Sequence, residues 1–161
     1  MTIEIIQADY RDAKQAKEIV TLLNAYASDP MGGGRPLTRE VLDNLTFELA
    51  RLPHAFSVIA YVDSRPVGLA NCFEMFSTFL CRPLVNIHDM VVLQEFRGQG
   101  ISRNILEKVE EIAVQKGCCK LTLEVLSGNT AARSVYQKFG FNNYELDPAH
   151  GQAMFWQKLL G

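Results

Sequence analysis

The stretch QEFRGQGIS, Gln94–Ser102, lies between a segment of β character and a segment of helical periodicity. Gly98 and Gly100 let the backbone approach a ligand closely, and the first turn of a helix presents unpaired N–H groups along a favourable dipole. Arg97 and Arg103 add positive charge on either side. The stretch predicts a cradle for phosphate. The alternative is a plain strand-to-helix turn that uses glycine only for its geometry.

The residues on both sides of this stretch predict the neighbouring elements. Upstream, Leu84–Leu93 is rich in β-branched and apolar residues and predicts a strand. Downstream, apolar residues at helical spacing predict a long helix from about Gly98 to Lys116, with Gly117 at its C-terminal end. After that helix, Lys120–Leu126 alternates apolar and polar residues, which predicts a strand with two different faces.

Working outward, Asp12 and Thr38 are placed to cap two amphipathic helices, and the glycine-rich segment 29–36 between them predicts a mobile loop. The other predicted elements are strands at Ile3–Gln7, Ala55–Val62, Val67–Phe76, Phe141–Glu145 and Ala153–Leu159, and a last helix from Asn129 to Gly140. The resulting order, β-α-α-β-β-β-α-β-α-β-β, predicts an α/β fold with a parallel or mixed sheet.

Length and composition limit the classes of function. The 161 residues predict a single domain over residues 1–161. A net charge of −2 gives no reason to expect nucleic acid or an anionic membrane as a partner. The N-terminus lacks a signal-peptide pattern, and no apolar stretch approaches the roughly 18 residues of a membrane span. We therefore expect a soluble, cytoplasmic protein.

The cysteines and histidines favour neither a disulfide framework nor a metal site. They form no Cys-x-x-Cys pair and no histidine pair at helical spacing, so no metal is expected. Each cysteine lies within or beside an apolar run, which predicts buried or half-buried packing. The four are Cys72, Cys81, Cys118 and Cys119.

Three known glycine motifs can be compared with the loop. A dinucleotide fingerprint needs a third glycine where Arg103 stands, and an ATPase-type loop needs Gly-Lys-Ser/Thr, which is absent. Residues 97–102 resemble the pyrophosphate motif of the GNAT superfamily of N-acetyltransferases, Arg/Gln-x-x-Gly-x-Gly/Ala, with Ser102 in place of the last small residue. Further along, residues 129–141 resemble the second GNAT signature, through Asn129, Ala132, Tyr136, Lys138, Gly140 and Phe141.

This resemblance implies the GNAT fold, a mixed central β-sheet with helices on both faces, and acetyl-CoA as the acyl donor. The main chain at residues 90–92 would face the pantetheine arm, the backbone of residues 98–103 would take the pyrophosphate, and Asn129 would bond the CoA arm. The implied cofactor-binding residues are Met90, Val91, Val92, Arg97, Gly98, Gln99, Gly100, Ile101, Ser102, Arg103, Asn129 and Ala132.

Direct attack by an amine on a thioester requires the ammonium to lose a proton and the leaving thiolate to gain one. Tyr136 matches the family's proton donor; its alternative role is a core aromatic. Glu124 and His88 are candidate proton acceptors, directly or through water. The spacing of Glu124 to Asn129 and Tyr136 resembles that of the catalytic glutamate in ribosomal-protein alanine acetyltransferases. His88 stands where spermidine/spermine and thialysine acetyltransferases carry a glutamate. A solvated glutamate and a structural histidine are the alternatives; the spacing favours Glu124.

Asp89 and Glu74 are candidate acceptor-binding residues. Glu74 belongs to the segment Phe73–Pro83, which resembles a stretch of the polyamine and thialysine enzymes that helps to form the acceptor pocket, although core or dimer packing is the alternative. A polyamine would need several convergent carboxylates, and the candidates here are Glu74, Asp89 and Glu124. We therefore expect a small-molecule primary amine or an amino acid as the substrate. The alternatives are a polyamine, a protein N-terminus, or a catalytically silent acyl-CoA-binding domain with a regulatory role. A homodimer is expected from the family and from the prevalence of twofold symmetry.

Overall fold

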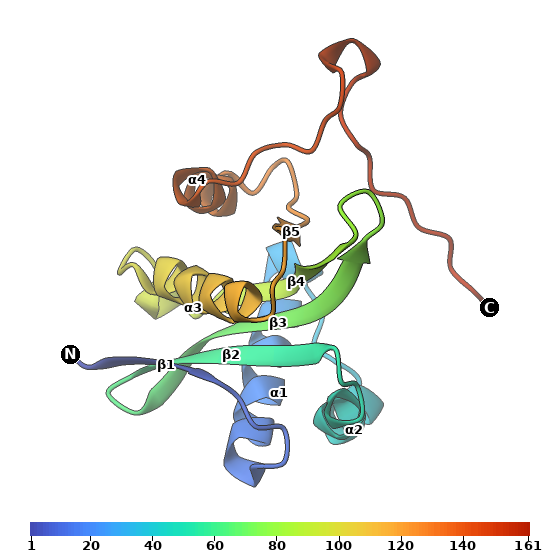
Figure 1. The fold of residues 1–161 in the computed structure, drawn as a ribbon. Helices are drawn as coiled ribbons and strands as arrows, with labels where there is room; N and C mark the ends of the chain where they lie inside the picture. Colours follow the sequence, from blue (N-terminus) through green and yellow to red (C-terminus); the bar gives the residue numbers. More distant parts are fainter.

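Five strands and four helices make up the fold, which a computed structural model describes for residues 1–161 (Figure 1). The strands are β1 (Ile3–Gln7), β2 (Ala55–Val62), β3 (Arg65–Ser77), β4 (Arg82–Val92) and β5 (Leu121–Leu123). The helices are α1 (Ala13–Ser28), α2 (Arg39–Ala50), α3 (Ile101–Gln115) and α4 (Thr130–Phe139). Short 3₁₀ turns occupy Pro30–Gly32, Gln94–Phe96 and Pro148–His150.

The strands form one mixed sheet in the order β1-β2-β3-β4-β5. β2, β3 and β4 follow one another along the chain and pair antiparallel, and β1 pairs antiparallel with β2. From β4 the chain passes through α3 before it reaches β5, and this helical crossover allows β4 and β5 to pair in parallel. The mixed sheet predicted from the sequence is therefore confirmed.

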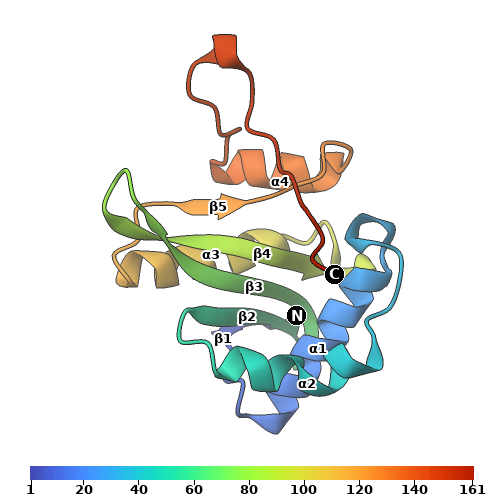
Figure 2. The same cartoon turned by 90° about the vertical axis from the view of Figure 1, so that its right-hand side faces the viewer.

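Apolar side chains cover both faces of the sheet. On one face, Ile105, Leu106 and Val109 of α3 are completely buried in the larger core cluster, against residues of β2, β3 and β4. On the other face, Ile19 and Leu22 of α1 pack in a second cluster with alternate residues of the same three strands. Figures 1 and 2 show α1 and α2 on one side of the sheet and α3 and α4 on the other. The predicted arrangement of helices on both faces is confirmed.

Local capping chemistry sets the ends of three helices as predicted. The side chains of Asp12, Thr38 and Asn129 accept hydrogen bonds from the first turns of α1, α2 and α4. Gly140, in the left-handed region, closes α4. The start of α3 differs from the prediction: the helix begins at Ile101, because the residues before it include two glycines with positive φ that cannot continue a helix.

Gly68 of β3 allows α3 to approach the sheet closely. A Cβ atom at this position would lie 2.8 Å from Cδ1 of Ile105 and 3.3 Å from the Cβ of Ala60. Such distances are shorter than ordinary van der Waals contacts, so a larger residue would push the helix and the strand apart. Glycine at this position therefore sets how deeply α3 packs on β3.

The two C-terminal strands predicted from the sequence are wrong. Residues 141–145 and 153–159 form no strand, and Figure 1 shows the chain after α4 running outside the layers of the fold. A strand needs a hydrogen-bonded neighbour, and the sheet here ends in β5, which is three residues long. The two segments share one backbone hydrogen bond, from Ala153 N to Tyr144 O at 3.3 Å, and Phe155 and Trp156 remain exposed.

Two smaller predictions also need correction. β5 covers residues 121–123 only, because beyond Leu123 the chain diverges from β4 and no further pair forms. Cys81 was predicted to be buried or half-buried, but it is exposed, because it lies on the turn between β3 and β4 with φ of +51°. Cys72 is buried, while Cys118 and Cys119 are half-buried, as predicted, and all four thiols are free.

Two further findings concern membranes and metals. None of the helices combines the length and the apolar character that crossing a bilayer requires. The structure gathers no group of three or more histidine, cysteine, aspartate or glutamate side chains in an arrangement that could hold a metal ion.

We expect Ile105→Ala to lower the free energy of unfolding by about 2–5 kcal/mol, because it leaves a cavity between α3 and the sheet. Urea denaturation followed by circular dichroism measures this change. Val114→Ala is the matched control: Val114 lies on the same helix but is 69% exposed, and its replacement should cost less than about 0.5 kcal/mol. Equal losses in the two variants would contradict the assignment of the buried helix face.

Candidate active site

The parallel pairing of β4 with β5 ends early and leaves an open edge. The two strands pair from Val85↔Leu121 to Ile87↔Leu123, and β4 then continues alone on this side to Val92. Met90, Val91 and Val92, which were predicted to face the pantetheine arm, lie on this unpaired length. The Val92 carbonyl accepts a hydrogen bond from Arg97 Nε at 2.9 Å. The open edge can therefore present main-chain groups to an extended ligand.

A cavity of about 340 Å³ adjoins the open edge. β4 contributes Met90, Val91 and Val92, and the facing wall comes from the start of α4. The end of α1 and the turn after it close the opposite side. The lining residues outside β4 are Tyr26, Asp29, Met31, Arg97, Gly98, Ser102, Asn129, Ala131, Ala132, Val135 and Tyr136. The cavity thus brings together elements from both faces of the sheet.

The start of α3 is the one helix terminus in the fold suited to an anion. The other three helices, α1, α2 and α4, each have a side-chain cap, whereas α3 has none. The first turn of α3 also carries no acidic residue. Gly98 and Gly100 have φ of +78° and +82°, and nothing lies within 4 Å of where a Cβ would stand on either. The first N–H groups of α3 therefore face open space, along a dipole that favours negative charge.

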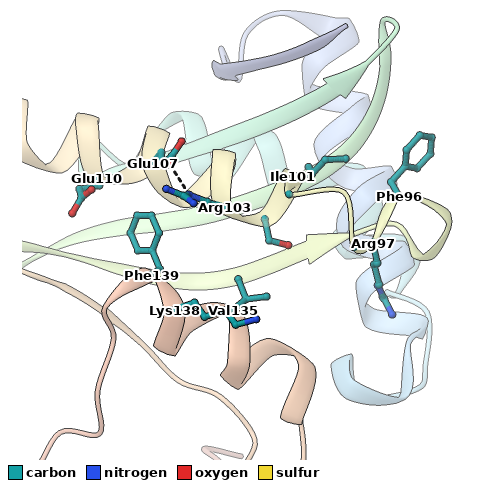
Figure 3. Close-up of a pocket in the computed structure, with 12 residues that line it drawn as sticks. Phe96, Arg97, Ile101, Arg103, Glu107, Glu110, Val135, Lys138 and Phe139 are labelled. Carbon is teal, nitrogen blue, oxygen red and sulfur yellow. Dashed lines mark hydrogen bonds and ion pairs between the residues drawn. The ribbon is translucent and has the colours of Figure 1, made fainter. Parts of the chain in front are cut away.

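A second cavity, of about 470 Å³, extends from this terminus along the cleft between α3 and α4 (Figure 3). It shares Arg97, Gly98, Ser102 and Val135 with the first cavity, so the two adjoin. Arg103 lies on its wall in an ion pair with Glu107 at 2.8 Å. The remaining lining residues are Phe96, Gly100, Ile101, Glu110, Lys138 and Phe139. The two adjoining cavities therefore meet at the start of α3.

Arg97 ties the loop to the end of α1. Its Nη2 atom lies 3.1 Å from Asp29 Oδ2, while its Nε donates to Val92 as described above. Asp29 also accepts the Met31 N–H, and these two donors, first the backbone one and then Arg97, hold the pKa of Asp29 below its usual range. The ion pair fixes the turn after α1 at the border of the first cavity.

Tyr136 lies in the first cavity, on the side of α4 that faces β4. Its ring packs edge-on against Phe141, with 5.9 Å between ring centroids. Burial, followed by the nearby Tyr26, raises the pKa of Tyr136 to about 12. The phenol therefore keeps its proton throughout the neutral range, which a proton donor requires.

His88 and Glu124 stand at the fork where the two strands separate. Each is one residue beyond the last pair, Ile87↔Leu123. The register between β3 and β4 passes from Asn71↔Asp89 to Cys72↔Ile87, so His88 is the extra residue of a β-bulge. Both His88 and Glu124 are exposed, and neither lines the two cavities. The two candidate proton acceptors thus each follow the last residue pair on their own strand, outside the cavities.

The other predicted site residues divide into two groups. Asp89 follows His88 on β4 and accepts a hydrogen bond from Asn71 Nδ2 at 3.0 Å. Glu74 and Gln99 lie outside both cavities: Glu74 forms an ion pair with Lys116 at 3.2 Å, and the Gln99 amide donates to the Glu95 carbonyl. Ala132 and Asn129 line the first cavity, where Asn129 Oδ1 caps α4 by accepting the Ala132 N–H.

Besides Ala131 and Val135 of α4, sequence reasoning missed three residues that line the first cavity: Tyr26, Asp29 and Met31. All three come from the end of α1 and the turn after it, far from residues 94–102 along the chain. The glycine-rich segment that follows was visible in the sequence as a loop. Its position beside Arg97, however, depends on how α1 crosses the sheet, and no local pattern encodes that contact.

Comparison with known proteins agrees with this geometry. The model of the acetyltransferase (GNAT) family matches residues 13–141, so the chain belongs to the GNAT family. Thialysine N-epsilon-acetyltransferase of Bos taurus is 39% identical over 74 residues, which are 46% of this chain and 43% of that protein. Aminoglycoside N(6')-acetyltransferase type 1 of Salmonella typhimurium is 26% identical over 101 residues, 61% of this chain and 70% of that protein. The match to the thialysine enzyme thus spans less than half of that enzyme's length.

Solved structures show the same fold. The aminoglycoside acetyltransferase AAC(6')-Iy, in complex with the bisubstrate analogue CoA-S-monomethyl-acetylneamine, superposes with a TM-score of 0.77 at 20% identity, covering 99% of this chain and all of that one. A structure described as a probable acetyltransferase gives a TM-score of 0.82 at 17% identity, with 98% and 99% coverage. The predicted GNAT fold is confirmed.

We expect Gly100→Asp to weaken CoA binding by about tenfold or more, because the carboxylate repels phosphate from the N-terminus of α3. Isothermal titration calorimetry measures the dissociation constant. Gly117→Asp is the control, since Gly117 follows the other end of the same helix with a similar φ of +72° and open space around it. An unchanged CoA affinity in Gly100→Asp would show that the cradle lies elsewhere.

Proposed function

We propose that the chain transfers an acetyl group from acetyl-CoA to a primary amine by direct attack in a ternary complex. The observation that carries this proposal is the position of Tyr136, a half-buried and protonated phenol in a cavity between the open edge of β4 and the start of α4. The same cavity adjoins the uncapped N-terminus of α3. One groove therefore joins an anion-binding terminus to a proton donor.

The residues present fit CoA along this groove. The unpaired edge at residues 90–92 supports hydrogen bonds to the amides of a pantetheine arm, and the free N–H groups at the start of α3 suit its pyrophosphate. Asn129 uses Oδ1 to cap α4, which leaves its Nδ2 atom to donate to the arm. When bound, acetyl-CoA supplies the thioester that the amine attacks.

Tyr136 donates a proton to the departing thiolate sulfur. Because the pKa of Tyr136 is raised to about 12, the phenolate left behind is strongly basic and regains a proton from neighbouring water. The amine loses its own proton through water at the fork, where Glu124 and His88 can accept it. Their exposed positions support this water-mediated route rather than direct contact with the reacting nitrogen.

The proposed acceptor is a small-molecule amine or an amino acid. The names of the relatives support an amine, since thialysine and aminoglycosides both carry amino groups. A thiol-release assay with acetyl-CoA against amines, amino acids, polyamines and N-terminal peptides tests this choice. Turnover of peptides or polyamines alone would favour those alternatives, and no thiol release would favour a silent CoA-binding domain.

The homodimer and the cytoplasmic location stay predictions.

We expect Tyr136→Phe to lower kcat by about ten- to ten-thousandfold while CoA affinity persists, because only the donated proton is removed. Steady-state kinetics and calorimetry measure the two quantities. In the wild type, the rate should not fall through ionisation of Tyr136 as the pH rises to 10.0, the ordinary pKa of tyrosine. Tyr144→Phe, at a phenol that is 60% exposed, is the control and should keep full activity. Full activity in Tyr136→Phe would assign this residue to the core alone.

For the proton acceptor, we expect Glu124→Gln to lower kcat/KM more than His88→Gln, with CoA binding intact in both. Each substitution keeps the approximate size of the side chain and removes its ability to take up a proton. Comparison of the two variants at one pH with the same amine measures the difference. A larger loss in His88→Gln would make the histidine the acceptor. Unchanged rates in both would mean that the substrate loses its proton to solvent.

A further inference from the structure

A row of polar side chains crosses the sheet on the face that α1 covers. Ser57 of β2 pairs in register with Asn71 of β3, and Asn71 pairs with Asp89 of β4. Tyr10, from the connection between β1 and α1, lies at the other end of the row beside Ser57. Ser57 and Asn71 are almost completely buried, at 0% and 4% exposure. The row thus runs through the interior and ends at a carboxylate.

Continuous hydrogen bonds join the four side chains. The Tyr10 hydroxyl lies 2.8 Å from Ser57 Oγ, Ser57 Oγ lies 2.6 Å from Asn71 Oδ1, and Asn71 Nδ2 lies 3.0 Å from Asp89 Oδ2. The other carboxylate oxygen of Asp89, Oδ1, accepts no hydrogen bond from the chain. One side of the carboxylate is therefore fixed, and the other is available to a ligand.

The chemistry of the four groups sets the direction of these bonds. An ionised carboxylate only accepts, so Asn71 must turn its NH₂ group toward Asp89 and its carbonyl toward Ser57. Ser57 must then use its single proton on Asn71, and Tyr10 must donate to Ser57. Every donor points along the row toward Asp89, and bonds aligned in this way strengthen one another in a buried setting.

The neighbouring row of residues on the same face shows that the strands pair and pack under α1 without polar side chains. Two residues along each strand, Ile59 pairs with Leu69 and Leu69 pairs with Val91, on the same face. All three are apolar and buried under α1. Buried polar groups must all find hydrogen-bond partners to avoid a cost in stability, whereas an apolar row has no such requirement. A role at the end of the row accounts for the difference.

The end of the row lies next to the candidate active site. Asp89 directly precedes residues 90–92, whose edge toward β5 is open, and it lies at the bulge that places His88 at the fork. It also lies near Tyr26, whose pKa is raised by burial and then by the charge of Asp89. Tyr26 lines the first cavity from the α1 side, whereas Tyr136 lines it from the α4 side. Asp89 itself does not line the cavity, but it is the residue before Met90, which does.

We infer that Asn71, backed by Ser57 and Tyr10, is a positioning residue that holds Asp89 ready to bind the ammonium group of the acceptor. This inference rests on the proposed function, because it concerns the amine of the same reaction. Asp89 Oδ1 forms the contact with the cation, and the buried row keeps the carboxylate from rotating away. The acceptor is thus a positively charged amine that is recognised before it loses its proton.

The experiment compares Asn71→Leu with the wild type, using whichever amine of the thiol-release panel turns over fastest. Asn71→Leu keeps the branching of the side chain at Cγ and removes both hydrogen bonds of the amide. We expect the KM for the amine to rise by about tenfold, while kcat and the KM for acetyl-CoA change by less than about threefold. Tyr10→Phe, which removes only the outermost donor, should act in the same direction by about two- to fivefold.

A double-mutant cycle with Asp89→Ala separates positioning from a structural role. If Asn71 acts through Asp89, adding Asn71→Leu to Asp89→Ala should leave the KM for the amine unchanged. A further rise in that background, or equal rises in the KM values of both substrates, would overturn the inference. Should Asn71→Leu fail to fold, as judged by thermal melting, the same cycle with Tyr10→Phe decides.

The outcomes also distinguish this inference from the proposed function. An absence of thiol release with every amine in the wild type would contradict the proposed function, and the inference with it. Release in the wild type together with an unchanged KM for the amine in Asn71→Leu and Tyr10→Phe would overturn the positioning role alone.

Discussion

The short parallel contact between β4 and β5 is the constraint on which the rest of the site depends. The contact consists of three residue pairs, after which β4 extends alone to Val92. Every parallel pairing needs a crossover, and α3 supplies it, so the helix that starts after the glycine loop must begin close to the end of β4. The chain then places α4 after β5, over the edge that β4 leaves open. The anion-binding terminus, the open edge and Tyr136 are neighbours for this reason.

Features that depend on neighbouring residues along the chain could be predicted from the sequence. Asp12, Thr38 and Asn129 cap helices because capping is chemistry within one turn. Gly98 and Gly100 were recognisable because two glycines before a helix favour a phosphate cradle or a tight turn at that place, and Tyr136 was found through a motif that also contains Asn129. The paired elements from β1 to β4 also followed from their apolar runs.

Features that depend on register or on a distant partner could not be predicted. Ser57 and Asn71 each appear in the sequence as single polar residues in apolar strands, and only pairing brings them into line with Asp89. The bulge at His88 changes the register by one residue and has no local signature. The segments 141–145 and 153–159 have strand-like composition, but composition does not provide the neighbour that a strand requires.

The uncapped start of α3 has a consequence for how such a protein can diverge. Its anion-binding groups belong to the main chain, and mutation replaces side chains while leaving N–H groups in place. Affinity for the proposed phosphate-bearing donor would thereby be robust to genetic drift at most positions of the loop, the glycines excepted. The opposite end of the groove is lined by the side chains of Tyr26 and Tyr136, and Asp89 directly precedes the lining residue Met90 on β4. One substitution there alters shape or charge, so new acceptor specificities can evolve while the donor is retained.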